Sequence, residues 1–221
     1  MNFKKIIMIT TLLFLLAAVL IYVKQHKEST NENKYEGKTW VTIGDSITYQ
    51  NGYQPLVDQT FHFGKIKNFG KSAYTTEMLV NEMDTWENGA ALVTFFAGTN
   101  NFGQNVDLDV TKRSTDQIFR HLKEKYPAAD IVVVLPSQRW GFMRDPIPEP
   151  TMKNHKGITL QQYCDTIEET AKKHKLPVID LYHNSGITKD NIDTYTKDGL
   201  HPNKKGFKKI ANVMSDFFIR F

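Results

Sequence analysis

The chain has 221 residues, of which 40% are hydrophobic, enough for one globular domain with its own core and a short additional segment. The formal charge is only +4, and two of the positive charges, Lys4 and Lys5, belong to the N-terminal segment, so we predict no nucleic-acid partner. A single cysteine excludes an intrachain disulfide, and the domain must therefore be stabilised by packing.

An apolar segment comes first along the chain. Residues 6–23 carry no charge and would span roughly 27 Å as a helix, near the thickness of the hydrocarbon core of a bilayer. The run is longer than a usual signal-peptide core and no small-x-small cleavage site follows it, so we predict that residues 1–23 are an uncleaved membrane anchor. Cleavage and secretion is the alternative.

The charges flanking this segment favour an N-terminus inside the cell, which makes the chain a single-pass protein of the cell membrane with its domain outside. Residues 24–38 are polar and lack periodicity, so we predict a stalk there. The domain is then expected to comprise residues 39–221.

From residue 39 onward, short apolar runs alternate with longer amphipathic stretches. This alternation predicts an α/β fold, in which a parallel sheet lies between helices on both faces as a three-layer α/β/α sandwich. The strands are expected at 39–43, 65–69, 91–97, 131–135 and 176–181, and the clearest helices at 110–126, 159–175 and 203–221.

The cysteine and the histidines give no sign of a metal site. Cys164 shares one helical face with Leu160 and Ile167, which predicts a small buried side chain. No histidine has the spacing of a ligand set, so we predict no metal and no cofactor. The histidines assigned to the surface or the core are His26, His62, His121, His155, His174 and His183.

One long segment, residues 138–157, resists assignment to a helix or strand. It holds three prolines together with several apolar side chains, which indicates a packed flap over a pocket. Trp140 and Phe142 would offer an apolar surface to an acyl group or a sugar, while Arg139 and Arg144 could pair with a phosphate or carboxylate. The alternative is that these side chains only cover the edge of the sheet.

Four loops contain residues suited to catalysis. Ligands of an open parallel sheet bind outside the carboxyl ends of its strands, and three of these loops directly follow expected strands. Taken singly, each loop has a structural explanation as a helix cap or a turn. The loops are Gly44-Asp45-Ser46-Ile47-Thr48, Asn68-Phe69-Gly70, Gly98-Thr99-Asn100-Asn101 and Asp198-Gly199-Leu200-His201-Pro202.

Together these loops provide what acyl transfer requires: a nucleophile, a base, a group that orients the base, and donors for an oxyanion. Ser46, His201 and Asp198 can fill the first three roles, because one turn can present both Asp198 and His201 on the same side. The backbone N–H of Gly70 and the side-chain amide of Asn100 can point at the oxyanion.

The four segments, in this order, resemble the SGNH hydrolase superfamily, also called GDSL esterases and lipases, over residues 39 to about 215. The resemblance implies that Ser46 is the nucleophile, His201 the base and Asp198 its orienter. It also implies an oxyanion hole formed by the N–H of Ser46 with Gly70 and Asn100. The fold expected on this basis is flavodoxin-like, with a five-stranded parallel sheet.

Two positions depart from the family pattern. Ile47 stands where leucine is common, which is a conservative change. Asn101 stands where aspartate is usual, which leaves Asn100 intact and puts the geometry of this loop in question.

We therefore predict a serine esterase that cleaves its substrate through an acyl-enzyme. A domain held outside a membrane would meet cell-envelope polymers, which favours O-acylated envelope glycans as substrates. The alternatives are a lysophospholipase or other lipid esterase, an acyltransferase with the same triad, and a non-catalytic module that binds a glycan or lipid.

Overall fold

The computed structural model describes residues 33–140 and 153–221, and residues 35–221 form one compact unit. The predicted anchor, most of the predicted stalk and Phe142 lie outside the described residues. Within the two described ranges, no helix combines the length and the apolar character needed to cross a membrane.

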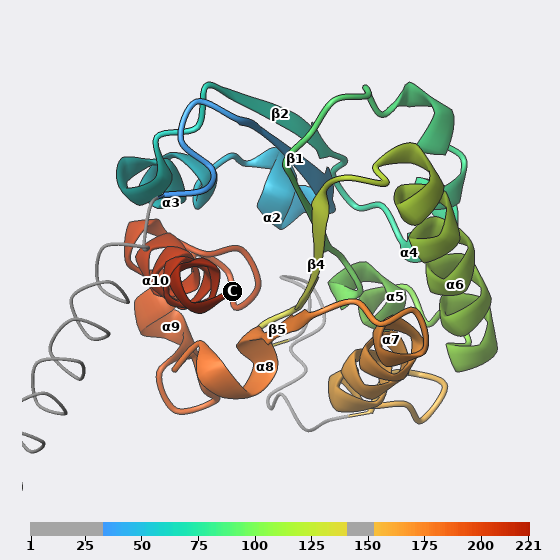
Figure 1. Cartoon of the computed structure of the whole chain (residues 1–221). Helices are drawn as coiled ribbons and strands as arrows, with labels where there is room; N and C mark the ends of the chain where they lie inside the picture. The colour runs from blue at the N-terminus through green and yellow to red at the C-terminus, as the bar shows by residue number, and fades with distance from the viewer. Residues whose placement is uncertain (1–32, 141–152) are drawn as a thin grey trace, which may run out of the picture. The chain divides into compact units, whose positions relative to one another are not determined.

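A five-stranded parallel sheet forms the centre of the domain (Figure 1), which confirms the predicted α/β fold. Its strand order, β2-β1-β3-β4-β5, is the flavodoxin-like order, in which the chain changes direction across the sheet after β2. Each strand lies within two residues of its predicted range at either end. The strands are β1 (Thr39–Gly44), β2 (Lys65–Gly70), β3 (Leu92–Phe96), β4 (Asp130–Leu135) and β5 (Val178–Asp180).

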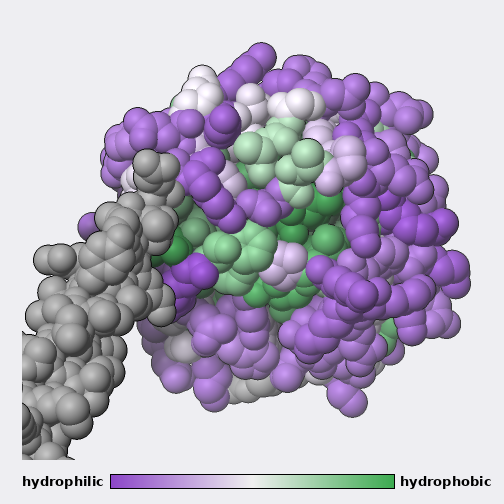
Figure 2. Space-filling view, viewed as in Figure 1, coloured by the Kyte–Doolittle hydropathy of each residue, from purple (hydrophilic) through white to green (hydrophobic). Residues whose placement is uncertain are grey.

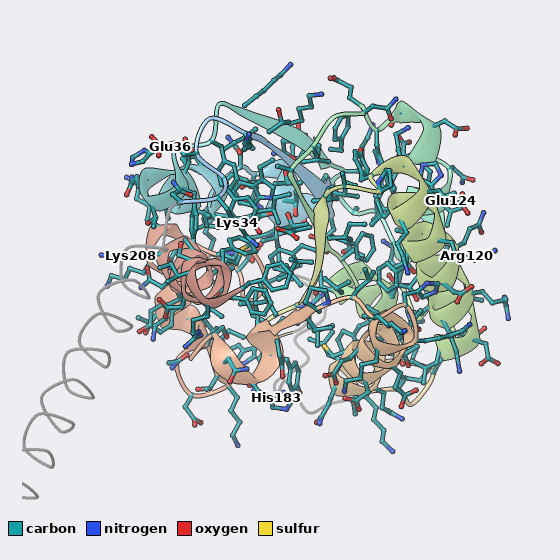
Figure 3. All side chains as sticks on the ribbon, in the orientation of Figure 1. Lys34, Glu36, Arg120, Glu124, His183 and Lys208 are labelled. Atoms are coloured by element: carbon teal, nitrogen blue, oxygen red, sulfur yellow. The ribbon has the colours of Figure 1, made fainter. Side chains whose placement is uncertain are left out.

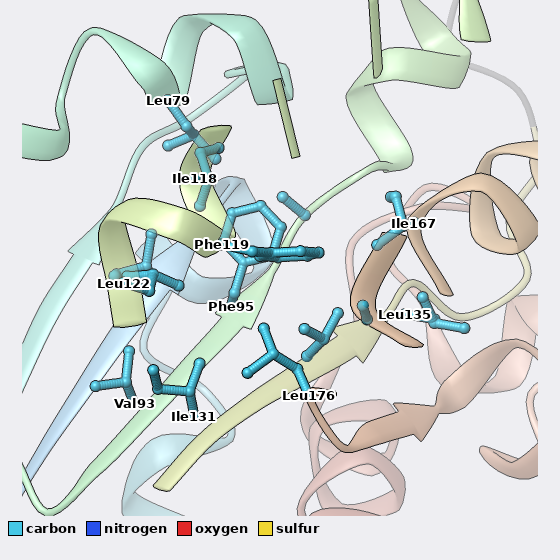
Figure 4. Close-up of a cluster of buried hydrophobic side chains, with 14 of the residues drawn as sticks. Leu79, Val93, Phe95, Ile118, Phe119, Leu122, Ile131, Leu135, Ile167 and Leu176 are labelled. Carbon is cyan, nitrogen blue, oxygen red and sulfur yellow. The ribbon is translucent and has the colours of Figure 1, made fainter. Parts of the chain in front are cut away.

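Alternate side chains of the strands enter two separate hydrophobic clusters, one on each face of the sheet. On one face Phe95 packs edge-to-face against Phe119, with their ring centroids 5.5 Å apart (Figure 4). Helices that contribute to this cluster include α4 (Thr76–Val80), α6 (Leu108–Lys125) and α7 (Leu160–Lys173). Cys164 lies here too, buried and unpaired, as predicted.

The opposite face is covered mainly by α3 (Gln54–Phe61) and α10 (Lys204–Arg220) (Figure 1). Here Trp40 and Phe96 from the sheet meet Phe218 and other apolar residues of α10. The central strands are buried on both faces, which explains why their sequences are almost continuously apolar.

Two of the long helices, α7 and α10, begin where a side chain caps them. Thr159 accepts a hydrogen bond from the Gln162 N–H and the Gln162 side chain bonds back, while Asn203 accepts from the N–H groups of Lys205 and Gly206. These caps explain why α7 and α10 each start one residue after the start of the predicted helix. The remaining short elements are α2 (Ser46–Tyr49), η1 (Met83–Thr85), α5 (Thr99–Gly103), α8 (Leu181–Asn184) and α9 (Ile192–Tyr195).

The domain begins before residue 39, which corrects the end of the predicted stalk. Tyr35 is 1% exposed, and its ring contacts those of Phe61, Phe63 and Phe218. Its hydroxyl donates to Asp130 at 2.8 Å. Polar neighbours on both sides hide this residue in the sequence, because a single buried aromatic produces no periodic pattern.

The outer faces of the helices are polar, as Arg120 and Glu124 on α6 and Lys208 on α10 illustrate (Figure 3). In the orientation of Figure 1, apolar side chains gather near the C-terminus within this hydrophilic surface (Figure 2). The hollow there has a volume of about 240 Å³ and is lined by Ile131, Leu176 and Phe221, among others. It lies where β4 and β5 begin, at the sheet edge opposite the carboxyl ends of the strands.

Candidate active site

Ser46 is held at the carboxyl end of the inner strand β1. Asp45 caps α2 by accepting a hydrogen bond from the Ile47 N–H at 3.0 Å, and Ser46 is the first residue of that helix. Gly44 allows this strand end to approach β3, because a Cβ there would lie 2.2 Å from the Phe96 carbonyl oxygen. The result is a 5% exposed serine at the edge where parallel sheets bind ligands.

His201 and Asp198 come from the loop before α10 and meet Ser46 across 155 residues of sequence. The Ser46 Oγ lies 3.0 Å from His201 Nε2, and His201 Nδ1 lies 2.7 Å from Asp198 Oδ2. Both distances are within hydrogen-bonding range. The structure therefore places the three predicted residues in one continuous chain of hydrogen bonds.

Asp198 is partly buried but well supplied with donors. Its Oδ1 accepts from the backbone N–H groups of Leu200 at 3.0 Å and His201 at 2.7 Å, while Oδ2 faces the imidazole. Burial alone would raise the pKa of Asp198, but these hydrogen bonds outweigh it and hold the pKa below its ordinary value. The carboxylate is thus ionised at neutral pH and fixes the tautomer of His201.

The two asparagines of the third loop have different partners. Asn100 donates from Nδ2 to the Tyr74 carbonyl at 3.0 Å, which leaves the second hydrogen of its amide for another acceptor. Asn101 is fully buried: its Oδ1 accepts from the Thr76 N–H, and its Nδ2 donates to the Thr76 and Thr111 hydroxyls. Asparagine in place of aspartate therefore supports this loop, because the amide donates as well as accepts.

Gly70 does not offer the free N–H that the sequence predicts. That N–H donates to Asn68 Oδ1 at 2.8 Å, within its own loop. The glycine is needed for packing, since a Cβ there would lie 2.2 Å from the backbone nitrogen of Tyr49 in α2. The expected oxyanion role of Gly70 is corrected on these grounds.

Sequence reasoning missed Ala73, three residues further on. Its φ of +63° is unusual for a residue with a side chain. Its N–H has no hydrogen-bond partner among the described residues, and the next residue, Tyr74, accepts from Asn100. No sequence signal marks this position, because alanine, unlike glycine, does not indicate a left-handed backbone conformation.

A model of the GDSL-like lipase/acylhydrolase family matches residues 42–209, a range that contains all of these loops. The chain belongs to this family. As a member it is classed as an ester-cleaving hydrolase.

An acetylxylan esterase from Xylanibacter ruminicola is 28% identical over 176 residues, which cover 68% of this chain but only 35% of that relative. Among solved structures, a protein from Lactobacillus plantarum is 20% identical with a TM-score of 0.74, covering 82% of this chain and 96% of its own. The acetyl xylan esterase AlAXEase is 18% identical with a TM-score of 0.65, covering 81% and 98%. At these identities the solved structures show a shared fold.

Within this family fold, Arg139, which the sequence suggested as a partner for a phosphate or carboxylate, is buried. Its side chain is 2% exposed, and it donates from Nη1 to the carbonyl and hydroxyl oxygens of Thr99 at 3.1 and 3.3 Å. A third bond joins Nε to the Trp140 carbonyl. The expectation that Arg139 pairs with a substrate anion is therefore corrected.

Of the predicted flap, only its two ends are described. The Trp140 N–H donates to the Gly199 carbonyl at 2.8 Å, so Trp140 lies beside the loop that carries Asp198 and His201. At the other end, Asn154 donates to the Phe102 carbonyl and the Tyr163 hydroxyl. Both ends are thus attached to the domain next to the candidate site. Phe142 and Arg144 lie outside the described residues.

Residues 33–140 and 153–221 contain no group of three or more His, Cys, Asp or Glu side chains that could hold a metal ion. His174 pairs with Asp116, and His183 pairs with Asp180.

Proposed function

We propose that this chain is a serine esterase in which Ser46, His201 and Asp198 act as the catalytic triad. The observation that carries the proposal is the hydrogen-bonded chain from Ser46 Oγ through both imidazole nitrogens to Asp198. Nucleophilic serine hydrolases need this relay, because a serine hydroxyl is a weak nucleophile until a base accepts its proton.

In the proposed reaction, Ser46 Oγ attacks the ester carbonyl as His201 Nε2 takes the hydroxyl proton. The tetrahedral intermediate collapses when His201 returns that proton to the departing alkoxide, leaving an acyl-serine. Water then attacks the acyl-serine, with His201 as base, and releases the acid and the free serine.

The developing oxyanion requires fixed donors. We assign this role to the backbone N–H of Ser46, the free hydrogen of the Asn100 amide and the backbone N–H of Ala73 in place of Gly70. Ala73 and Asn100 are linked through Tyr74, whose carbonyl accepts from Asn100. Donors held in this way need little rearrangement when the negative charge appears.

O-acylated glycans are the proposed substrates. Support comes from the acetylxylan esterase relative, although the chain spans 35% of that protein's length. Tyr49 in α2 also lies 62% exposed three residues after Ser46, where a tyrosine ring can stack against a sugar face. A lipid ester is the second candidate, because the apolar side chain of Trp140 lies beside Gly199, in the loop of Asp198 and His201.

The triad is tested by Ser46→Ala and His201→Ala, each expected to lower kcat on a p-nitrophenyl ester by roughly four orders of magnitude or more. Ser215→Ala, at a half-buried serine of α10, is the matched control and should keep wild-type activity. Activity of Ser46→Ala equal to that of the wild type would refute the assignment.

The substrate class is tested with p-nitrophenyl esters of increasing acyl length, acetylated xylan and lysophospholipid. Preference for short acyl chains together with release of acetate from the polysaccharide supports a glycan esterase. Preference for long chains and lysophospholipid supports the lipid alternative. Acyl transfer to a sugar would appear as an acylated product in place of free acid.

We also propose that residues 1–23 anchor the chain in the cell membrane with the domain outside, since residues 6–23 are long and apolar enough to span a bilayer. Membrane fractionation combined with protease treatment of intact cells tests this. Release of a shortened protein into the medium would support cleavage instead.

A further inference from the structure

Arg139 is the most deeply buried cation near the candidate site, and the esterase mechanism above gives it no role. An arginine is seldom fully buried unless it is paired with anions or bonded to several acceptors. Three of its hydrogen bonds go to uncharged oxygens, two of them on Thr99, the residue before Asn100. The guanidinium therefore holds the base of the oxyanion loop directly.

Two carboxylates interact with this cation through space. Asp45 lies before the Ser46 helix, and Asp198 orients His201. Asp45 is completely buried, and its Oδ2 has no hydrogen-bond partner within the described part of the chain. Arg139 is thus a buried positive charge that attracts the ionised carboxylate of Asp198 and favours the charged form of Asp45, whose pKa burial raises to about 7.

The backbone beside Arg139 adds a second connection. The Trp140 N–H donates to Gly199, which lies between Asp198 and His201. A Cβ on Gly199 would lie 3.0 Å from that of Trp140, so these two chain segments are packed closely. The segment 139–140 therefore contacts the loop of His201 by its backbone and the loop of Asn100 by its side chain.

We propose that Arg139 is a positioning residue that joins the loop of Asn100 to the loop of Asp198 and His201, and that its buried positive charge balances Asp198 against His201. Thr99 lies at the start of α5, and Asp198 and His201 lie in the loop before α10. The inference rests on the proposed triad, but it can be tested without a substrate.

Burial lowers the pKa of Arg139 to about 10, with Asp45 and Asp198 opposing the change, so the guanidinium is charged at neutral pH. Removing this charge leaves the ionised carboxylate of Asp198 less balanced and favours the protonated imidazolium of His201. The pH at which the His201 ring titrates should therefore rise by roughly one unit. A merely structural role would not move this titration in a folded variant.

The experiment compares Arg139→Met, Arg139→Gln and Arg139→Lys with the exposed control Arg113→Met in the full chain. The His201 ring is followed by NMR against pH, with its signal assigned through His201→Gln, and folding is checked by thermal unfolding. The neutral variants should raise the titration midpoint by roughly one pH unit. The lysine variant and the control should stay within a few tenths.

On a p-nitrophenyl ester, the neutral variants should lose about ten- to a hundred-fold in kcat with little change in KM, because loops displaced by even 1 Å align poorly. The acidic limb of the curve of kcat against pH should move with the His201 titration. The lysine variant should keep the limb but lose part of kcat, since it cannot reproduce the guanidinium fork.

A folded neutral variant with an unmoved His201 titration and wild-type kcat overturns the proposal. If neither neutral variant folds, Arg139→Lys decides: an unmoved limb with reduced kcat supports the proposal, and a shifted limb or wild-type kcat refutes it. A full effect on the His201 titration without any Ser46-dependent esterase activity would instead overturn the proposed function alone.

Discussion

At the scale of single residues, Asn100 and Asn101 are neighbours with different tasks. The free amide hydrogen of Asn100 is proposed to bond the oxyanion. The amide of Asn101, in contrast, already makes its hydrogen bonds to Thr76 and Thr111. We expect Asn100→Ala to lower kcat by about a hundred- to a thousand-fold at nearly unchanged stability, as for loss of one oxyanion donor.

Asn101→Ala provides the contrast to that variant. It should reduce the free energy of unfolding by about 1–3 kcal/mol, because it leaves buried partners unsatisfied, with a smaller effect on kcat. Kinetics and chemical denaturation of both variants measure the two effects. The assignment fails if the two variants behave alike.

Asp45 predicts a pH dependence of stability. Burial raises its pKa from the ordinary 3.8 to about 7, against the lowering effects of the Ile47 N–H and Arg139. Between about pH 4 and pH 7 the folded protein therefore holds a proton that the unfolded chain has lost. The free energy of unfolding should fall across this window by roughly 2–4 kcal/mol from this group.

Asp45→Asn keeps the acceptor for Ile47 but cannot ionise, so its unfolding free energy should lack this decrease. Denaturant unfolding of both proteins at pH 4.5, 6 and 8 gives the comparison. Parallel pH curves for the two proteins would mean that Asp45 does not titrate in this range.

At the scale of elements, the contact between β2 and α2 determines where Ser46 sits. A Cβ at Gly70 would lie 2.2 and 2.6 Å from the nitrogen and Cα of Tyr49, which are backbone atoms that a rotamer change cannot move. Gly70→Ala should therefore cost about 1–3 kcal/mol of stability and lower kcat by displacing α2. Thermal unfolding and kinetics on a p-nitrophenyl ester measure both.

Gly89→Ala is the control, since a Cβ there meets nothing within 4 Å and only its φ of +80° is strained. It should lose some stability but keep kcat. A large loss of kcat in Gly70→Ala at wild-type stability would instead restore the oxyanion role that the sequence assigned to Gly70.

At the scale of the whole molecule, the N-terminal boundary of the domain affects stability. Tyr35 contacts an aromatic group that also contains Phe61, Phe63 and Phe218, and it bonds Asp130 at the start of β4. A chain that begins at residue 39 should unfold about 3–5 kcal/mol more easily than one that begins at residue 33, the usual cost of deleting a buried aromatic.

Denaturant unfolding of the two shortened chains measures this difference. Tyr35→Phe in the longer chain should lose only about 1 kcal/mol, which isolates the hydroxyl bond from the packing of the ring. Equal stabilities of the two shortened chains would show that Tyr35 contributes nothing to the domain.

The sequence by itself determined the fold and the position of the candidate site. Apolar strands that alternate with amphipathic helices can bury their surfaces in few other ways, and parallel strands bring their carboxyl ends to one edge. Ser46, Asn100, Asp198 and His201 were predictable for this reason, because each lies next to a clear element boundary.

Only the tertiary structure decided how polar groups are shared between distant segments. Whether the Gly70 N–H is free depends on the rotamer of Asn68, and whether Arg139 faces solvent depends on Thr99, Asp45 and Asp198. The local pattern of apolar and polar residues in the sequence predicts which side chains are buried at regular intervals. It does not describe competition for hydrogen-bond acceptors and for buried charge, which is settled only when the loops are packed together.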